Sequence, residues 1–416
     1  MRSVGFFLLL FSWAWGEWEV DASVGSFYQR MLLANAHVAP YSADVRAHLQ
    51  AKHTNEAQDF LLHLDADALY DDQDTNRRYV YLNEAKAVWQ TDDATISVGN
   101  IIGAWGKMDI YSPIDTLNAR NLLKDPLAND KLGATALQYR HYLDNGEWEV
   151  TVKFLETMQS LPYTASPYYF LDPKVCFGDL ESHLVLWRPT LFARYSTTVE
   201  MGESSFDHTF ILANGFDAIR GVIDGGQNDD FYDLTPLLFY STKAMYAIAV
   251  PLEAWILKSE MALAYSEDSR VSHYGQLALA AEYATQTPWG QSLLYLSEYH
   301  RFVRWESTKL SALQLMQFFQ NDWVIGVRMG LNDAYNSALM AAIIVDMEGQ
   351  GSATQLSFNS KLIDSVSYSL RWLHLVPRDA THSTALPASS FDAMVGSFLD
   401  AIGAHDSITV GLTYHF

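Results

Sequence analysis

The chain has 416 residues, one Cys and a formal net charge of −22, with 18% charged and 49% hydrophobic residues. Low charge at ordinary hydrophobicity excludes a disordered chain, and the strong negative charge excludes nucleic acid as an expected partner. One thiol cannot form an internal disulfide or a multi-Cys metal centre. A single core of this length normally splits into domains, unless the fold is one large sheet closed on itself.

The N-terminus predicts export. A short positive start is followed by an apolar run from Val4 to Trp15, and Ala14 and Gly16 are small residues at the positions that a signal peptidase reads. We therefore expect a cleaved signal peptide over 1–16. An uncleaved anchor would need about 20 apolar residues and is disfavoured. An exported, aromatic-rich chain without disulfides predicts a β-barrel of the bacterial outer membrane over 17–416.

The first predicted strands are four weakly alternating segments and one clear hairpin. In the hairpin over 132–155, Asn145-Gly146 is typical of a two-residue type I′ turn and predicts that Leu143 pairs with Trp148. Its apolar face would contact lipid, while its face of mixed charge would contact water. The four weaker segments are 18–28, 57–67, 77–91 and 94–104.

Period-two alternation continues downstream. It is clearest over 365–372, and it breaks at Leu373 and His374, which predicts that this strand meets the membrane interface there. Eight-residue Ala338 to Val345 is the longest uninterrupted apolar stretch after the signal peptide. Further strand candidates are 192–201, 207–216, 241–250, 255–265, 276–284, 290–302, 309–319, 322–332, 338–348, 353–362 and 407–416.

The strand candidates give an approximate number of strands for the barrel. With both termini on the periplasmic side, the candidates put 158–190 and 217–240 at the wrong end, which indicates one missed or split strand between 217 and 362. We predict an all-β, transmembrane antiparallel barrel of about 16 strands, within a range of 14–18. Its long loops would be 106–131, 158–190, 217–240 and 376–405, the last with a short helix near 391–402.

The last residues of the chain carry an aromatic signal. Thr409, Gly411, Tyr414 and Phe416 place polar, glycine, aromatic and terminal aromatic residues at offsets of 0, 2, 5 and 7. This pattern resembles the last-strand signal of bacterial outer-membrane barrels. The resemblance implies that the barrel-insertion machinery reads Gly411, Tyr414 and Phe416.

A second motif lies near residue 100. Gly99 is followed by Trp105-Gly106, and Asp115 and Asn118 come later. The spacing resembles the signature of a porin-like family of Gram-negative outer-membrane barrels, defined as a domain of unknown function. Asn100 and Lys107 differ from the residues usual in that family, so the resemblance implies the fold and not a ligand role.

Charged residues on the polar faces are candidates for a lumen filter. A Lys on the lipid face would cost about 2–4 kcal/mol near the midplane, so these side chains should point into the lumen. They could form a filter that orients a solute, or a fixed lattice of ion pairs that packs a narrow lumen. The candidates are Arg140, Glu149, Lys258, Glu260, Glu282, Arg328 and Arg371.

Other chemistry has weaker signals. The acidic segment 224–233 could hold a cation or bridge lipopolysaccharide, but it is more typical of a solvated loop. Ser369 and His374 fall on opposite faces of one strand, and no motif singles out a nucleophile and base. We expect no metal and no cofactor.

These patterns predict an outer-membrane porin-like channel for passive passage or export of a small solute. The alternative is a structural or surface-interaction barrel with a closed lumen, and the third hypothesis is a lipid-modifying enzyme. Expected partners are outer-membrane lipid and lipopolysaccharide, the barrel-insertion machinery and an unidentified small solute.

Overall fold

The computed structural model describes most of the chain. The described residues are 16–33, 37–125, 130–157, 160–169, 175–178, 188–202, 204–228, 231–305, 319–347, 351–377 and 405–416. All but the last residue of the expected signal peptide, and the short helix expected near 391–402, lie outside these ranges. Both therefore stay predictions.

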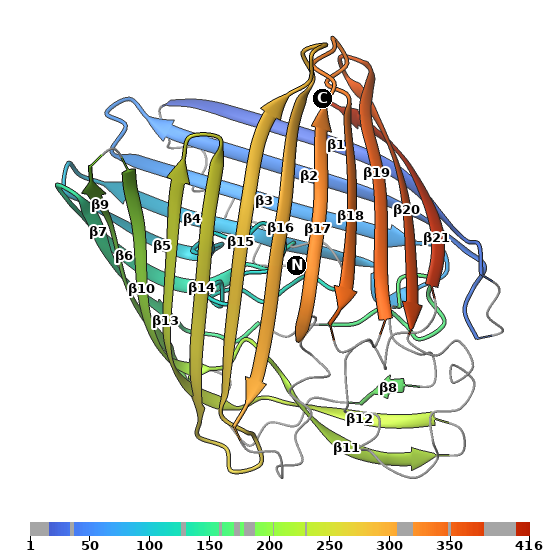
Figure 1. Ribbon diagram of the computed structural model, residues 1–416, viewed down its shortest axis with the longest axis horizontal. Coiled ribbons are helices and arrows are strands. Elements are labelled where there is room, and N and C mark those ends of the chain that lie inside the picture. Colours follow the sequence, from blue (N-terminus) through green and yellow to red (C-terminus); the bar gives the residue numbers. More distant parts are fainter. Residues whose placement is uncertain are drawn as a thin grey trace.

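Eighteen strands form one closed antiparallel sheet (Figure 1). Each strand pairs with the next in the sheet along the chain, and β1 pairs with β21, so the sheet has no free edge. The strands are β1 (Gly16–Met31), β2 (Tyr41–Asn55), β3 (Phe60–Asp71), β4 (Tyr79–Gln90), β5 (Ala94–Ile101), β6 (Ala134–Leu143), β7 (Gly146–Lys153), β9 (Thr190–Met201), β10 (Ser204–Phe216), β13 (Tyr240–Leu252), β14 (Trp255–Ser266), β15 (Tyr274–Gln286), β16 (Ser292–Arg304), β17 (Asn321–Gly330), β18 (Ala338–Asp346), β19 (Gly351–Ile363), β20 (Val366–Pro377) and β21 (His405–His415).

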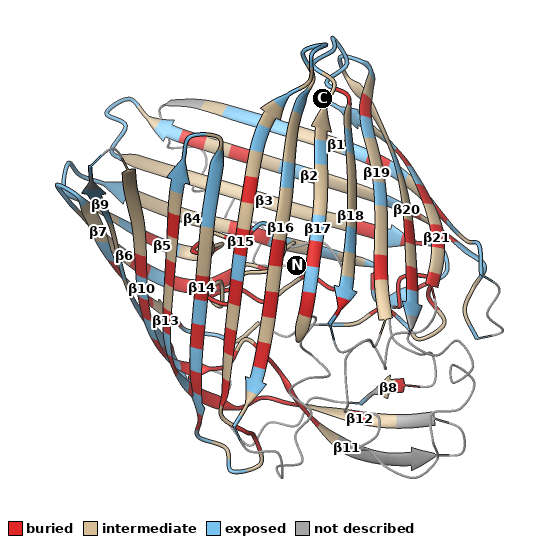
Figure 2. Cartoon of the chain, in the orientation of Figure 1, coloured by how far each residue is buried: buried red, intermediate tan, exposed pale blue. Residues whose placement is uncertain are grey.

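Exposure alternates along the barrel strands, as Figure 2 shows by its bands of colour. On β14, Trp255, Leu257 and Met261 are exposed on the outside, whereas Glu260 and Ala262 are buried inside. Outward apolar residues and inward polar ones are what a lipid exterior and an aqueous lumen require. In the described part of the chain, no helix is long and apolar enough to cross a membrane.

The predicted all-β barrel is confirmed, and it has 18 strands rather than about 16, at the upper limit of the predicted range of 14–18. The alternation missed β2, because Ala43 and Ala47 on its outward face give little contrast with its inward face. The candidate strand at 309–319 lies almost entirely outside the described residues, and β16 pairs directly with β17, so no barrel strand separates them. The sequence-based strand list put 158–190 and 217–240 at the wrong end of the barrel because it contained this surplus candidate, not because it missed a strand between 217 and 362.

The predicted hairpin register was also wrong. Leu143 pairs with Gly146 rather than with Trp148, and the turn residues are Asp144 and Asn145. Gly146 belongs to the strand, where an added Cβ would lie 2.3 Å from the backbone oxygen of Ser196 on β9. The error is two residues, so each side chain still faces the side that the sequence predicted.

The two ends of the barrel differ. The connections longer than ten residues, including 102–133 and 217–239, all lie at one end, here called the long-loop end. The connections of two or three residues lie at the other, the short-turn end, together with Gly16 and Phe416, the first and last described residues. A second sheet of β8 (Val175–Phe177), β11 (Gly221–Asn228) and β12 (Phe231–Leu237) lies at the long-loop end (Figure 1).

Gly99 allows β4 and β5 to approach closely. Its φ is +130°, and an added Cβ would lie 2.0 Å from the carbonyl oxygen of Ala85. We expect Gly99→Ala to lower the free energy of unfolding by about 2 kcal/mol or more, measured by guanidinium titration in detergent. Gly290→Ala is the control, because Gly290 has φ +85° and no atom near its Cβ position. Equal losses for the two variants would contradict the role of the close approach.

Candidate functional site

The connection between β5 and β6 folds into the barrel. Its described residues, 102–125 and 130–133, are here called the inserted segment. The segment contacts inward side chains on strands from several parts of the barrel wall, including Glu149 on β7, Glu298 on β16 and Arg371 on β20. The inserted segment therefore crosses the lumen and narrows it.

Two wall carboxylates hold the backbone of the inserted segment. Glu260 on β14 accepts hydrogen bonds from the backbone N–H groups of Lys107 and Met108, the latter at 3.2 Å. Glu298 on β16 accepts from Asp109 at 2.8 Å and Ile110 at 3.2 Å. Both carboxylates are fully buried. A hydrogen bond to a charged group contributes about 1.5–3 kcal/mol, so the four bonds fix this stretch against the wall.

A side-chain lattice adds to this attachment. Trp105 donates its indole N–H to Glu149 at 3.1 Å, and Arg140 and Arg194 each donate to the other oxygen of Glu149 at 2.9 Å. Around Trp105, the predicted lumen residues Arg140 and Glu149 therefore neutralise each other's charge. They form a fixed lattice rather than a row of free charges.

The lattice extends to other predicted lumen residues. Lys258 Nζ lies 2.7 Å from an oxygen of Asp109 and also pairs with Glu282. Arg371 pairs with Asp125. The inserted segment therefore brings together six of the seven predicted residues, directly or through one partner. Arg328 has no close ion pair or hydrogen bond in the described part of the chain and interacts with Asp109 of the inserted segment only electrostatically.

The residues of the family-like motif shape the inserted segment. The Asn118 amide accepts a hydrogen bond from Gly103 N at 2.8 Å and donates to the carbonyls of Ile101 at 2.8 Å and Leu132 at 2.9 Å. It thereby joins the two ends of the segment. Asp115 pairs with Lys131. Gly106 leaves space for Ser112, whose Oγ would lie 2.3 Å from an added Cβ.

Sequence reasoning missed Glu298 and Arg77. Glu298 faces the lumen from β16, as Glu260 does from β14. A search for every carboxylate on the lumen side of a predicted strand would have found it. Arg77 is the first residue of the predicted strand 77–91, but it lies in a 3₁₀ turn (Thr75–Arg77) before β4, which begins at Tyr79. Its side chain is fully buried.

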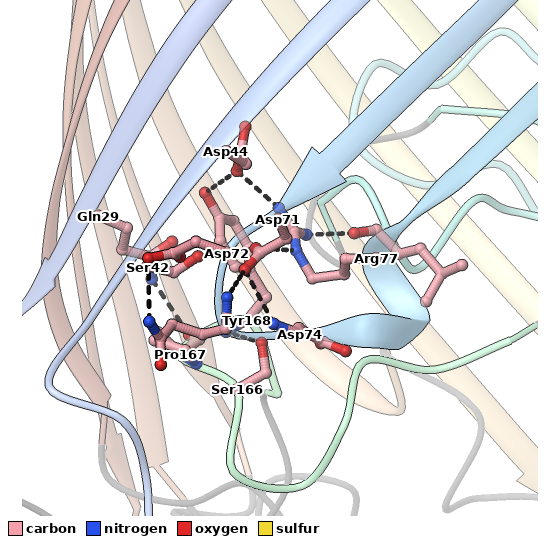
Figure 3. Close-up of polar contacts among 12 residues, drawn as sticks. Gln29, Ser42, Asp44, Asp71, Asp72, Asp74, Arg77, Ser166, Pro167 and Tyr168 are labelled. Atoms are coloured by element: carbon pink, nitrogen blue, oxygen red, sulfur yellow. Dashed lines mark hydrogen bonds and ion pairs between the residues drawn. The ribbon is translucent and has the colours of Figure 1, made fainter.

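Arg77 joins three connections at the long-loop end (Figure 3). Its guanidinium donates to Asp71 at 2.8 Å and to Asp44 at 2.7 Å, and it also bonds the carbonyls of Leu123 and Lys124 in the inserted segment, the latter at 3.2 Å. The ring of Tyr168, from the connection after β7, lies 3.3 Å from the guanidinium carbon. Cation–π contacts of this kind are strongest where water is excluded.

Glu156 forms another buried attachment at this end. One of its oxygens lies 2.6 Å from Lys153 Nζ and the other lies 2.6 Å from Arg220. Burial on its own would raise the pKa of Glu156, but the two cations lower that pKa below its ordinary value of 4.5. A carboxyl whose pKa is lower in the folded state stabilises the fold fully at neutral pH, and this contribution is lost as the pH falls through the folded-state pKa.

We therefore expect Glu156→Gln to lower the free energy of unfolding at neutral pH by about 3 kcal/mol. The difference from wild type should shrink only below pH 4.5, as the wild-type carboxyl takes up its proton. Urea titrations at stepped pH test this. Glu56→Gln, in an exposed turn, is the control and should change stability little at any pH. A difference independent of pH would contradict the ion-pair account.

The lumen keeps an open pocket of about 290 Å³ between the inserted segment and the β16–β20 wall. Leu373 is buried against this pocket, and β20 continues past it to Pro377. The strand thus continues beyond Leu373 and His374, and the membrane interface expected at these residues stays a prediction. The alternation breaks there because the inward face becomes apolar, while His374 pairs with Asp406 at 3.2 Å.

The C-terminal residues lie on β21 and just beyond it. Tyr414 and Phe416 are exposed, and their ring centroids are 4.8 Å apart. Gly411 faces inward, where an added Cβ would lie 2.4 Å from the ring of Phe27. Recognition of these residues by the insertion machinery stays a prediction. Within the described ranges, no group of three or more His, Cys, Asp or Glu is placed to hold a metal ion.

The comparisons with known proteins find similarity in the fold. No family model matches the sequence, and no curated protein matches it. The structure is similar to Pseudomonas aeruginosa OccK11 (OpdR), with a TM-score of 0.52 at 9% identity over 96% of each chain. It is also similar to OccK8 (OprE) of the same organism, with a TM-score of 0.51 at 9% identity over 96% of this chain and 98% of that chain.

A third similar structure is Escherichia coli Wzi, described as a carbohydrate-binding β-barrel involved in capsule assembly. Its TM-score is 0.53 at 10% identity, over 94% of this chain and 83% of that chain. Identities this low show the fold alone. The chain has the porin-like β-barrel fold of bacterial outer-membrane proteins.

Proposed function

We propose that the protein is a porin-like channel of the bacterial outer membrane through which a small solute diffuses. The observation that carries this proposal is the arrangement of the inserted segment. Glu260 and Glu298 hold the segment to one part of the wall, while a pocket stays open between the segment and the β16–β20 wall. A segment that only plugged the barrel would fill this space. With long loops outside and short turns inside, the short-turn end with Gly16 and Phe416 faces the periplasm.

Liposome swelling tests the proposal without knowledge of the natural solute. Purified protein in liposomes should admit small uncharged solutes such as glycerol or arabinose faster than raffinose, because the inserted segment narrows the lumen. Protein-free liposomes supply the background rate. Equal rates with and without protein would contradict a channel.

The second candidate is a surface-interaction barrel with a closed lumen. The buried cluster around Arg77 favours it, because this cluster ties the inserted segment to two other connections at the long-loop end. A closed barrel would give no swelling for any solute. The two candidates therefore differ in the same experiment.

A further inference from the structure

The lumen wall formed by β16–β20 is apolar where a porin lumen is expected to be polar. One row of paired residues across these strands contains Leu296, Ala342 and Leu373, with Gln355 as its polar side chain. The next row toward the long-loop end contains Val324 and Ile344 and begins at Glu298 on β16. Outward residues on the same strands, such as Leu339, are apolar as well. Because both of its faces are apolar, β18 accounts for the longest apolar run in the mature sequence.

These inward residues do not serve only to pack the inserted segment. Where the segment packs against the opposite wall, Ile114 and Leu117 are fully buried in a cluster with Phe192. In contrast, Leu296 and Ile344 are only half-buried around the open pocket. Apolar surface left in contact with water costs free energy in proportion to its area, so the pocket favours an apolar occupant.

The pocket also has a basic side. Arg328 lies in the row next to Leu296, on the side of the short-turn end, and lines the pocket together with Arg120 of the inserted segment, whereas Arg371 shares the row of Arg328 without lining the pocket. Arg371 is paired with Asp125. Arg328 is exposed and has no hydrogen bond or close ion pair in the described part of the chain, and its charged neighbour in the pocket is Asp109, with which it interacts electrostatically. Asp109 also lines the pocket, but its carboxylate pairs with Lys258.

We propose that this pocket binds a small amphipathic anion, an apolar carbon chain that ends in one anionic group. The anionic group contacts Arg328, and the chain lies along the apolar rows that include Leu296 and Ile344. A pocket of about 290 Å³ is at the lower limit for small-molecule sites, which fits a chain of modest length. The proposal deepens the proposed channel function and rests on it, since the solute reaches the pocket through the lumen.

Equilibrium binding of radiolabelled octanoate to the protein in lipid nanodiscs tests the proposal, with protein-free nanodiscs as background. Affinity should rise about fourfold for each methylene added from butyrate to octanoate, because the added carbons are buried along the apolar rows. Octylammonium, with the same chain and the opposite charge, should compete poorly with octanoate.

Two lumen variants test separately the binding of the ligand's anionic group and the binding of its carbon chain. Arg328→Gln should weaken octanoate binding about tenfold, because a charge-assisted hydrogen bond is lost. Leu296→Gln should reduce the dependence of affinity on chain length. Arg30→Gln is the control, since Arg30 is an exposed arginine on the outward face of β1 and should leave binding unchanged.

The outcomes distinguish the pocket from the channel. If liposomes with wild-type protein swell but octanoate binds no more tightly than butyrate or octylammonium, the pocket proposal is wrong and the channel stands. If octanoate binding depends on Arg328 but no solute causes swelling, the channel is wrong and the pocket stands. Equal binding by wild type and Arg328→Gln would overturn the assigned role of Arg328.

Discussion

Alanine at both Glu260 and Glu298 should raise the single-channel conductance at least about twofold, because the lumen is no longer narrowed at this point. Together the two carboxylates accept four backbone hydrogen bonds from consecutive residues of the inserted segment, Lys107 to Ile110. Without these acceptors, the stretch loses its attachment to β14 and β16. Recordings from single proteins in planar bilayers measure the change directly.

The paired control is the double variant Glu260→Gln and Glu298→Gln. Glutamine keeps an oxygen that can accept the same N–H groups but removes the charge, so the conductance should increase less than with alanine. Glu200→Ala removes a carboxylate at the short-turn end of β9 that forms no contact with the described residues of the inserted segment, and it should leave the conductance unchanged. An unchanged conductance in the double alanine variant would contradict the role of the two carboxylates.

Replacing Arg77 should have the largest effect on stability. Arg77→Ala leaves Asp71 buried without its cation, leaves Asp44 with Arg46 as its remaining cation, and removes a donor from the carbonyls of Leu123 and Lys124. Breaking a buried ion pair by removing one partner costs about 3–5 kcal/mol, because the remaining charge is uncompensated. Guanidinium titration in detergent, followed by tryptophan fluorescence, measures the loss.

Arg78→Ala is the matched control for Arg77. The neighbouring arginine is exposed, donates to the backbone oxygens of Asp71 and Asp72 and lies 4.8 Å from the ring centroid of Tyr70, so its loss should cost about 1 kcal/mol. Arg77→Lys should fall between the two, because one ammonium cannot reproduce the forked contact with two carboxylates. Similar losses for Arg77→Ala and Arg78→Ala would contradict the buried cluster.

The barrel could be predicted from sequence wherever large apolar residues alternate with polar ones. Segment 365–372 shows this pattern because its outward residues include Tyr368, Leu370 and Trp372. β2 was missed because alanines on its outward face give no such contrast. The apolar lumen wall has a related effect, since the inward Leu373 interrupts the apolar–polar alternation although β20 continues to Pro377.

The candidate site could be predicted only in part. Parity alone places Lys258 and Glu260 on the lumen side of β14. It cannot show that Glu260 bonds the backbone of Lys107, which lies 153 residues earlier in the chain. Contacts between distant segments depend on closure of the barrel, and no local pattern encodes them. The inserted segment was therefore predicted as a long loop, without its partners on the wall.

Single-channel recording of the wild-type protein, with no partner added, tests the central claim that a continuous water path passes the inserted segment. We predict stable, discrete conductance steps that reverse sign with the applied voltage. A variant lacking residues 378–404, between β20 and β21, should also conduct. Silence from both the wild type and this variant would contradict the account, because neither would contain an open lumen.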